Sequence, residues 1–383
     1  MRWLVVGACL AGCQFRAGGA IGRDGGSLVV DAASEQPPPE GPQSDCAWTY
    51  TPANFDPCML PAPGTMPSAD QTIDTDNLGS LPAMTSMQDD GVTLVVVHLV
   101  SLEVSGGWTI TGSAALVLAV DGAVTIDSGA SIAVSANSDD PMACTALTGN
   151  AGTNSTADGD GGGGGAGGAG AGNSGKGGNG DGSAKGTGGA VVNGVASMLS
   201  PLHGGCPGGG GGTDNSNGTP GVGGAGGGAL EISSDSTIVI AGEIEAVGQG
   251  ATGAASAKTG AGGGGGGGAI FVEGASVHLQ IGAVLCGDGG SGGDGGGSTA
   301  TGAPGDVSPC NDIAGALTMS QANNGGAGGG GGFGKSSNGV NGVNAQGGGH
   351  GGGGGGGGAA GWIRLGGPQM PTIDPGAVIT PMQ

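Results

Sequence analysis

The chain has 383 residues, of which 101 are glycine, and only four Trp, one Tyr and four Phe, so its core must be built from short aliphatic side chains. Glycine costs roughly 1 kcal/mol per helical position relative to alanine, so glycine runs such as 262–268 and 351–358 exclude long helices. A formal net charge of −22 excludes electrostatic binding to nucleic acid and to anionic membrane surfaces, because both need clustered Lys and Arg. The acidic charge is expected to keep this Gly-rich chain soluble.

The apolar stretch WLVVGACLAG near the amino terminus is too short to span a bilayer and ends at Cys13, as in an export signal. The residues Leu10-Ala11-Gly12-Cys13 resemble the lipobox of bacterial lipoproteins, in which cleavage leaves the cysteine as the lipid-bearing first residue. Cys9 is a weaker candidate because less apolar sequence precedes it. The resemblance implies a signal peptide over 1–12, lipidation of Cys13 with palmitate-type chains, and a membrane anchor. In that family Gln14, after the cysteine, implies the outer membrane.

Residues 13–45 contain the Pro-rich stretch SEQPPPEGPQ and no periodic apolar pattern, so we expect a flexible tether after the lipidated cysteine. The next segment, 46–91, begins with CAWTYTPANFDPC, which places Trp48, Tyr50 and Phe55 between two cysteines. We expect a small disulfide-stapled segment in which the rings pack on the bridge. A glycan-stacking site formed by the same three rings is the alternative.

The cysteines that follow the signal peptide and the lipobox are expected to be oxidised, because the chain is exported: Cys46, Cys58, Cys144, Cys206, Cys286 and Cys310. Sequence proximity favours Cys46 with Cys58 and Cys286 with Cys310, which leaves Cys144 with Cys206; other connectivities remain open. None of them has zinc-type spacing, and the histidines are scattered singly, so we expect neither a metal nor another cofactor.

Residues 92–383 carry a repeated unit of short strands. The copies AALVLAVDGAVTIDSGASIAVSA (114–136), GALEISSDSTIVIAGEIEAVGQG (228–250) and GAIFVEGASVHLQIGAVLCGDGG (268–290) each contain three alternating apolar segments separated by Asp, Ser and Gly. A degenerate copy starts at GAAGWIRLGG. Units of this length match one coil of a parallel β-helix. The sequence therefore predicts an all-β fold, a short parallel β-helix or irregular β-solenoid; a β-sandwich is the alternative, and it would need hairpin turns.

Long Gly-rich loops at 137–227, 251–267 and 291–359 interrupt these repeats after the third strand of each copy. In GDGGSGGDGGG the residues Asp288, Ser291 and Asp294 recur at every third position, which is the period of the polyproline II helix. Glycine segments of this kind can approach closely and hydrogen-bond through their backbones, with side chains along one edge. The loops are expected to be either polyglycine-II-like or disordered.

Sequence matches to catalytic motifs are as frequent as chance gives in a Gly-rich chain. GGSGG around Ser291 fits the G-x-S-x-G pattern but lacks the strand-to-helix elbow that this pattern needs. Asp121, Asp127 and Asp235 fall at strand corners, where Asp is a good turn former, so no converging pair of carboxylates is expected. The chain is therefore not expected to be an enzyme.

From the lipobox to its end the chain resembles the glycine-rich surface lipoproteins of myxobacterial type, on repeats such as LVLAVDGAVTIDSGASIAVSA and stretches such as GGGGGGGGAAGWIRLGG. It is more distantly similar to the PE-PGRS group of Gly-rich surface proteins, from which it departs by lacking the PE module. The expected function is that of a non-catalytic structural or adhesive lipoprotein, anchored in the cell envelope at the outer membrane or cell surface. Its expected partners are the membrane, through the lipid, and extracellular glycans, matrix or other cells. A carbohydrate-binding surface protein is the alternative, with a polysaccharide-acting β-helix enzyme as a weaker one.

Overall fold

The computed structural model describes residues 48–89, 91–135, 149–155, 161–164, 173–181, 186–190, 199–213, 218–310, 324–333, 337–346 and 350–381. Every described residue belongs to one compact unit, Asp45–Gln383. The signal peptide predicted for 1–12, the lipidation site Cys13 and the tether predicted for 13–45 lie outside the described residues.

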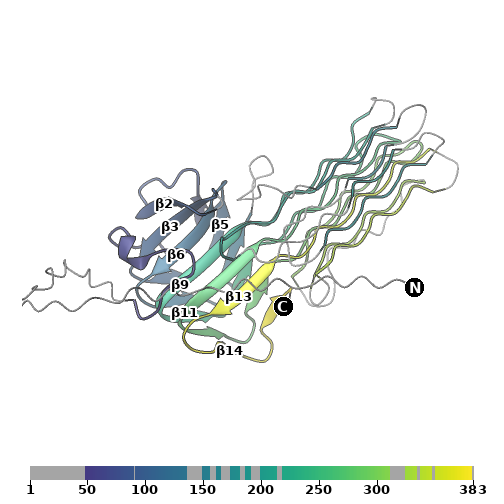
Figure 1. The fold of residues 1–383 in the computed structure, drawn as a ribbon. Coiled ribbons are helices and arrows are strands. Elements are labelled where there is room, and N and C mark those ends of the chain that lie inside the picture. Colours follow the sequence, from purple (N-terminus) through teal and green to yellow (C-terminus); the bar gives the residue numbers. More distant parts are fainter. Residues whose placement is uncertain are drawn as a thin grey trace, which may run out of the picture. The chain divides into compact units, whose positions relative to one another are not determined.

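The described chain is almost entirely β-structure, with one short 3-10 helix, η1, at Pro57–Met59 (Figure 1). One sheet has six strands in the order β1-β5-β8-β10-β12-β15, all paired in parallel. Its strands are β1 (Gln71–Asp74), β5 (Gly107–Thr111), β8 (Ser131–Val134), β10 (Glu243–Glu245), β12 (Val284–Cys286) and β15 (Val378–Thr380).

The second sheet has nine strands, of which β13-β11-β9-β6-β3-β2 are paired in that order; β14 pairs with β11, β7 with β9, and β4 with β7. Only the β2–β3 pair is antiparallel among the described strand pairs. The strands are β2 (Ala83–Met87), β3 (Thr93–Leu99), β4 (Leu102–Val104), β6 (Ala115–Val120), β7 (Val124–Ile126), β9 (Ala229–Ile240), β11 (Ala269–Leu279), β13 (Trp362–Gly366) and β14 (Thr372–Ile373). This parallel pairing confirms an all-β fold and differs from the hairpin-connected strands that a β-sandwich would show.

The strands of successive copies pair in register, so equivalent apolar residues stack in rows. In one such row Leu116 pairs with Leu230, Leu230 with Ile270, and Ile270 with Ile363. The first three of these side chains are fully buried in the main hydrophobic core. Stacked aliphatic side chains therefore supply the core that the scarcity of aromatic residues requires.

The strands differ in two ways from the repeat pattern predicted from the sequence. In the copies at 228–250 and 268–290 the first two predicted strands are one continuous strand, β9 or β11, and only the copy at 114–136 has three separate strands. An additional copy, formed by β3, β4 and β5, precedes the three predicted copies. Its strands pair with β6, β7 and β8, respectively. The segment 46–91 also contributes β1 and β2, one to each sheet.

The Gly-rich loops run side by side as extended segments that leave the strands together, and we call them the glycine bundle (Figure 1). Backbone hydrogen bonds recur at every third residue: the amides of Gly221, Gly224 and Gly227 donate to the carbonyls of Gly260, Gly263 and Gly266 at 2.8–2.9 Å. These bonds recur with the three-residue period of the sequence and join the described segments backbone to backbone. Each loop follows a strand of the six-stranded sheet, β8, β10 or β12, as the repeat pattern predicts.

The most Gly-rich segments, 259–268 and 351–361, are buried along their whole length. The first of them is hydrogen-bonded to segments around 161–164, 206–212, 221–227, 249–252, 290–296 and 353–359. A methyl group on Gly355 would overlap the carbonyl oxygen of Gly262, and one on Gly265 would overlap that of Ala225. Only glycine permits this packing, which explains why these stretches contain almost nothing else.

The outer segments of the glycine bundle carry the side chains. Asn338, Asn341 and Asn344 are exposed, and each side-chain Oδ1 accepts a hydrogen bond from the backbone amide of Asn173, Lys176 or Asn179, respectively, at 2.7–2.8 Å. The inner segments 259–268 and 351–361 are thus almost entirely glycine, whereas the outer segment 338–344 has glycine at every third position.

Candidate functional site

Residues 48–61, called the cover segment below, lie on the outer face of the nine-stranded sheet. The rings of Trp48 and Tyr50 have centroids 5.8 Å apart, and those of Trp48 and Phe55 are 5.5 Å apart in an edge-to-face arrangement. Trp48 and Phe55 are half-buried against an apolar cluster on this face that includes Val117 and Phe271. The structure therefore brings the three predicted rings together, with the sheet as their support, and this geometry favours packing over glycan stacking.

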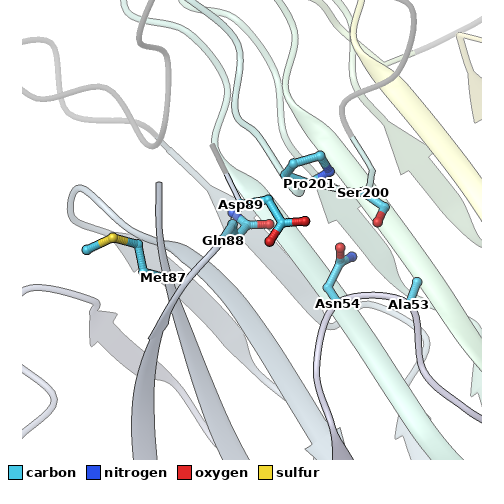
Figure 2. A pocket seen from close by; sticks show the side chains of 7 residues that line it. All are labelled: Ala53, Asn54, Met87, Gln88, Asp89, Ser200 and Pro201. Atoms are coloured by element: carbon cyan, nitrogen blue, oxygen red, sulfur yellow. The ribbon is translucent and has the colours of Figure 1, made fainter. Parts of the chain in front are cut away.

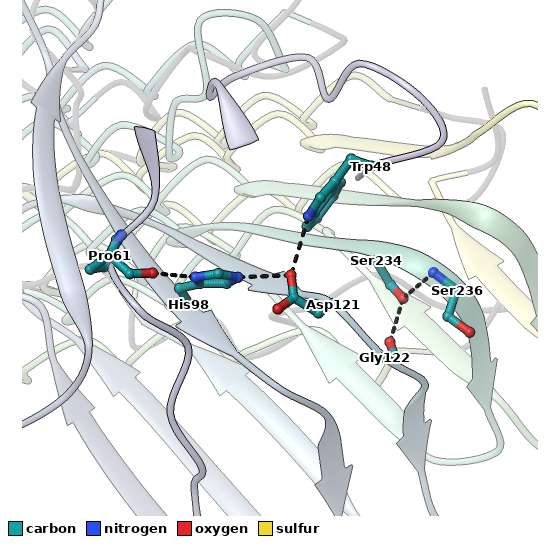
Figure 3. A network of polar contacts seen from close by, with 7 residues as sticks. All are labelled: Trp48, Pro61, His98, Asp121, Gly122, Ser234 and Ser236. Atoms are coloured by element: carbon teal, nitrogen blue, oxygen red, sulfur yellow. Dashed lines mark hydrogen bonds and ion pairs between the residues drawn. The ribbon is translucent and has the colours of Figure 1, made fainter. Parts of the chain in front are cut away.

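Asp121 holds the start of the cover segment (Figure 3). Its Oδ1 accepts a hydrogen bond from the indole Nε1 of Trp48 at 3.2 Å and lies 2.8 Å from His98 Nε2. His98 Nδ1 lies 2.5 Å from the carbonyl oxygen of Pro61, near the other end of the segment. Asp235 acts in the same way, because its Oδ1 accepts hydrogen bonds from the backbone amide and the hydroxyl of Thr49. Both aspartates, expected only as turn formers, thus fasten the cover segment.

A second polar contact in Figure 3 lies where the pairing of β9 with β11 shifts its register, between Ser234 and Thr237 of β9. The Ser234 hydroxyl donates to the carbonyl oxygen of Gly122 at 2.7 Å and accepts from the backbone amide of Ser236 at 3.0 Å. The bond to Gly122 ties the middle of β9 to the turn between β6 and β7. No catalytic arrangement follows from it, since both of its partners are backbone groups.

Two acidic side chains that sequence reasoning missed lie beneath the cover segment. Glu231 on β9 is fully buried; its Oε2 accepts a hydrogen bond from Asn54 Nδ2 at 2.6 Å, and its Oε1 has no partner among the described residues. Glu273 on β11 is 5% exposed, and its Oε1 accepts from Ser233 Oγ at 2.9 Å and from the Ala53 amide at 3.1 Å. Alternation places both residues on the face opposite Leu230 and Ile232, so only their acidic character in a buried strand could have marked them.

Burial controls the protonation of this cluster. It raises the pKa of Glu231 well above 4.5, and the nearby charge of Glu273 raises it further. Burial also raises the pKa of Glu273, opposed by the hydrogen bonds from Ser233 and Ala53 and by the charge of Arg364. The pKa of the Tyr50 hydroxyl, which lies 2.9 Å from Ser233 Oγ, is likewise raised by burial. Glu231 thus holds its proton at higher pH than a solvated Glu does.

A cavity of about 300 Å³ adjoins this cluster where the cover segment, the end of β2 and the turn at 199–202 meet (Figure 2). Its lining residues are Ala53, Asn54, Met87, Gln88, Asp89, Ser200 and Pro201. Asn54 links it to the buried carboxylates, because its Nδ2 donates both to Glu231 and to the carbonyl oxygen of Leu199, each at 2.6 Å. The sequence contains no local signal for this cavity, because the three segments that form its walls are far apart in the chain.

In the glycine bundle the side chains of Asp288, Ser291 and Asp294 are all fully buried. Asp288 accepts hydrogen bonds from Ser308 and Thr380, each at 2.7 Å, and Asp294 accepts one from the Gly328 amide at 2.8 Å. The three-residue spacing therefore supplies buried links between segments of the bundle.

The structure joins Cys286 and Cys310 by a disulfide, the pair that sequence proximity favours. Cys58 and Cys206 each take part in a further disulfide. The partners favoured for them, Cys46 and Cys144, lie outside the described residues.

Among the described residues, Glu243, Glu245 and Cys310 form a cluster of potential metal ligands. The sulfur of Cys310 is already bonded to Cys286, so only two carboxylates remain to act as ligands. Burial and the adjacent Glu243 raise the pKa of Glu245 to about 7. The group is therefore an acidic pair beside a disulfide and offers too few ligands for a metal centre.

No family model matches the chain, and comparisons with curated proteins and with solved structures gave no match. Among the described residues no helix has the length and apolar character needed to cross a membrane.

Proposed function

We propose that the chain is a non-catalytic structural or adhesive lipoprotein of the cell envelope, held at the outer membrane or cell surface by a lipid on Cys13. In this proposal the stacked copies are successive coils of a short parallel β-helix, and the loops form a polyglycine-II bundle. The in-register pairing of β6, β9, β11 and β13 supports the first part, and the hydrogen bonds at every third residue support the second.

The packing of the glycine bundle is the observation that carries the proposal. Its most Gly-rich segments, 259–268 and 351–361, are joined through backbone hydrogen bonds. The buried side chains of Asp288 and Asp294 accept hydrogen bonds from other segments of the chain, so they serve to hold the bundle together. The outer segments of the glycine bundle display Asn, Val and Thr side chains, and many hydrogen bonds hold these segments in place. Such a surface suits many weak contacts with matrix, glycans or other cells, because repeated copies on one cell add their affinities.

An attachment assay tests this role. Cells that lack the chain, and cells that carry Gly355→Ala in the bundle interior, are expected to attach less well than the wild type. The matched variant Gly210→Ala should attach normally, because the atom nearest to an added methyl group there lies 3.7 Å away. Unchanged attachment in all strains, together with release of reducing sugar from a polysaccharide by the purified chain, would replace this proposal with the enzymatic alternative.

The lipid anchor has its own test. Labelling cells with a palmitate analogue should mark the wild-type chain and the Cys9→Ser variant equally and leave Cys13→Ser unlabelled. Equal label on Cys13→Ser would remove the anchor from the proposal.

A further inference from the structure

The cavity beside the cover segment has walls that are fixed by hydrogen bonds. Gln88 Nε2 donates to the carbonyl oxygen of Leu202 at 3.0 Å, and the Leu202 amide donates back to Gln88 Oε1 at 2.6 Å. Asn54 Nδ2 fastens the cover segment to the same turn through the carbonyl oxygen of Leu199. Three segments that are distant in sequence therefore hold one shape, as a preformed binding site requires.

The groups that face the cavity are mainly hydrogen-bond acceptors. The amide nitrogen of Asn54 is occupied by Glu231 and Leu199, which leaves Oδ1 as the Asn54 atom that faces the cavity. Figure 2 shows the side chains of Asn54, Asp89 and Ser200 directed toward one another across this space. A carboxylate, an amide oxygen and a hydroxyl together select a ligand that donates several hydrogen bonds.

From this geometry we propose that the cavity binds the primary ammonium group of a small amine, in which the three N–H donors meet Asp89, Asn54 and Ser200. One carboxylate balances a single positive charge, whereas Ca²⁺ takes six to eight oxygens and usually several carboxylates. The formal net charge of −22 draws cationic ligands toward the chain. Ala53, Met87 and Pro201 supply apolar surface for the carbon skeleton of the amine.

Two sources present this group outside a cell: amino sugars with a free amine, and lysine side chains of proteins. Both fit a cavity of about 300 Å³, which lies at the small end of ligand sites. The site belongs to the sheet part of the chain, so it stands or falls independently of the role proposed for the glycine bundle.

The test follows the NMR signal of the Asn54 side-chain amide in the purified full-length chain, identified by its loss in Asn54→Asp. Glucosamine and Nα-acetyl-lysine amide, in which the side-chain amine is free, are titrated separately, with glucose and CaCl₂ as comparison ligands. We expect a saturable shift with one or both amines, and the amine that saturates at lower concentration identifies the source. Asp89→Asn should weaken this binding about tenfold or more, as expected for the loss of one charge-assisted hydrogen bond.

The matched control is Glu103→Gln, which removes one negative charge from an exposed position on β4. It should bind like the wild type, which separates the local carboxylate from net charge. Equal shifts with glucose would overturn the proposal in favour of a polyol site, and saturation by CaCl₂ alone would overturn it in favour of a metal site. Unchanged amine binding by Asp89→Asn, or no shift with either amine, would equally refute it.

Discussion

Glu231 and Glu273 show how a single residue type changes character when a distant segment covers it. Both lie at positions of β9 and β11 that alternation assigns to the face opposite the core, where acidic side chains are usually solvated. The cover segment removes them from water, and Asn54, 177 residues from Glu231 in sequence, becomes its hydrogen-bond donor. Burial therefore raises the pKa of both carboxyl groups in the folded chain.

The first prediction concerns the pH dependence of stability. Above 4.5 an unfolded Glu231 loses its proton while the folded chain keeps it, so the folded state holds more protons. The free energy of unfolding should therefore fall as the pH rises from 4.5 toward the raised pKa. Glu231→Gln keeps an oxygen for Asn54 and removes this loss, so the variant should be more stable than wild type at about pH 7 and similar to it below about pH 4.

Chemical denaturation at a series of pH values measures this difference. Glu103→Gln on β4 is the control, because its exposed side chain should give the pH profile of the wild type. A Glu231→Gln profile parallel to that of the wild type would show that Glu231 is not the group that titrates.

At the scale of the element, the glycine segments set the second prediction. Gly355→Ala places a methyl group against the Gly262 carbonyl oxygen inside the bundle, and overpacking of this kind costs about 1–3 kcal/mol or more. Gly210→Ala has space for its methyl group and should change the free energy of unfolding by less than about 1 kcal/mol. Denaturant melts of both variants measure the contrast, and equal stabilities would contradict the packing described here.

The disulfide gives the third prediction. It joins Cys286 at the end of β12 to Cys310 across a separation of 24 residues, and the closed loop contains the buried segment 287–297. Replacing both cysteines with Ser should lower the free energy of unfolding by about 3 kcal/mol, because the unfolded chain regains the entropy of the open loop. Replacing only Cys9 should have no such effect. An unchanged denaturation midpoint in the double variant would mean that the bundle alone fixes this loop.

Much of this element-level structure could be predicted from the sequence, for a physical reason. Strand alternation and the period of three are local patterns. The strand positions of Leu230 and Ile232, and the place of Asp288 in a three-residue repeat, can therefore be read from the residues next to them. The continuity of β9 and of β11 could not be predicted, because Asp and Ser in 233–236 and Gly274 look like turns, whereas pairing with the neighbouring strand keeps them extended. The cavity and the buried carboxylates depend on contacts between distant segments, for which no local pattern exists.

At the scale of the whole molecule, the loops and the strands depend on each other. The loop at 137–227 supplies Leu199, Leu202 and Cys206 to the apolar cluster that lies between the outer face of the sheet and the cover segment. The same loop supplies neighbours of the buried segment 259–268 at 161–164, 206–212 and 221–227. Strand stacking alone predicts that the loop is dispensable, because β6 and β9 pair without it. The bundle contacts predict the opposite.

The last prediction decides between these two views. Deleting residues 137–227 leaves β8 joined to the start of β9, so amides of β9 and β11 should stay protected from hydrogen exchange. The amides of 259–268 should lose protection, because their hydrogen-bond partners at Cys206, Gly209 and Gly212 are gone and a glycine segment has a large entropy to regain. Hydrogen exchange with mass spectrometry resolves the two regions within one sample, and β6 serves as the internal reference. Retained protection across 259–268 would show that the remaining segments form the bundle by themselves, whereas loss of protection in β9 and β11 as well would show that the sheets need the bundle to fold.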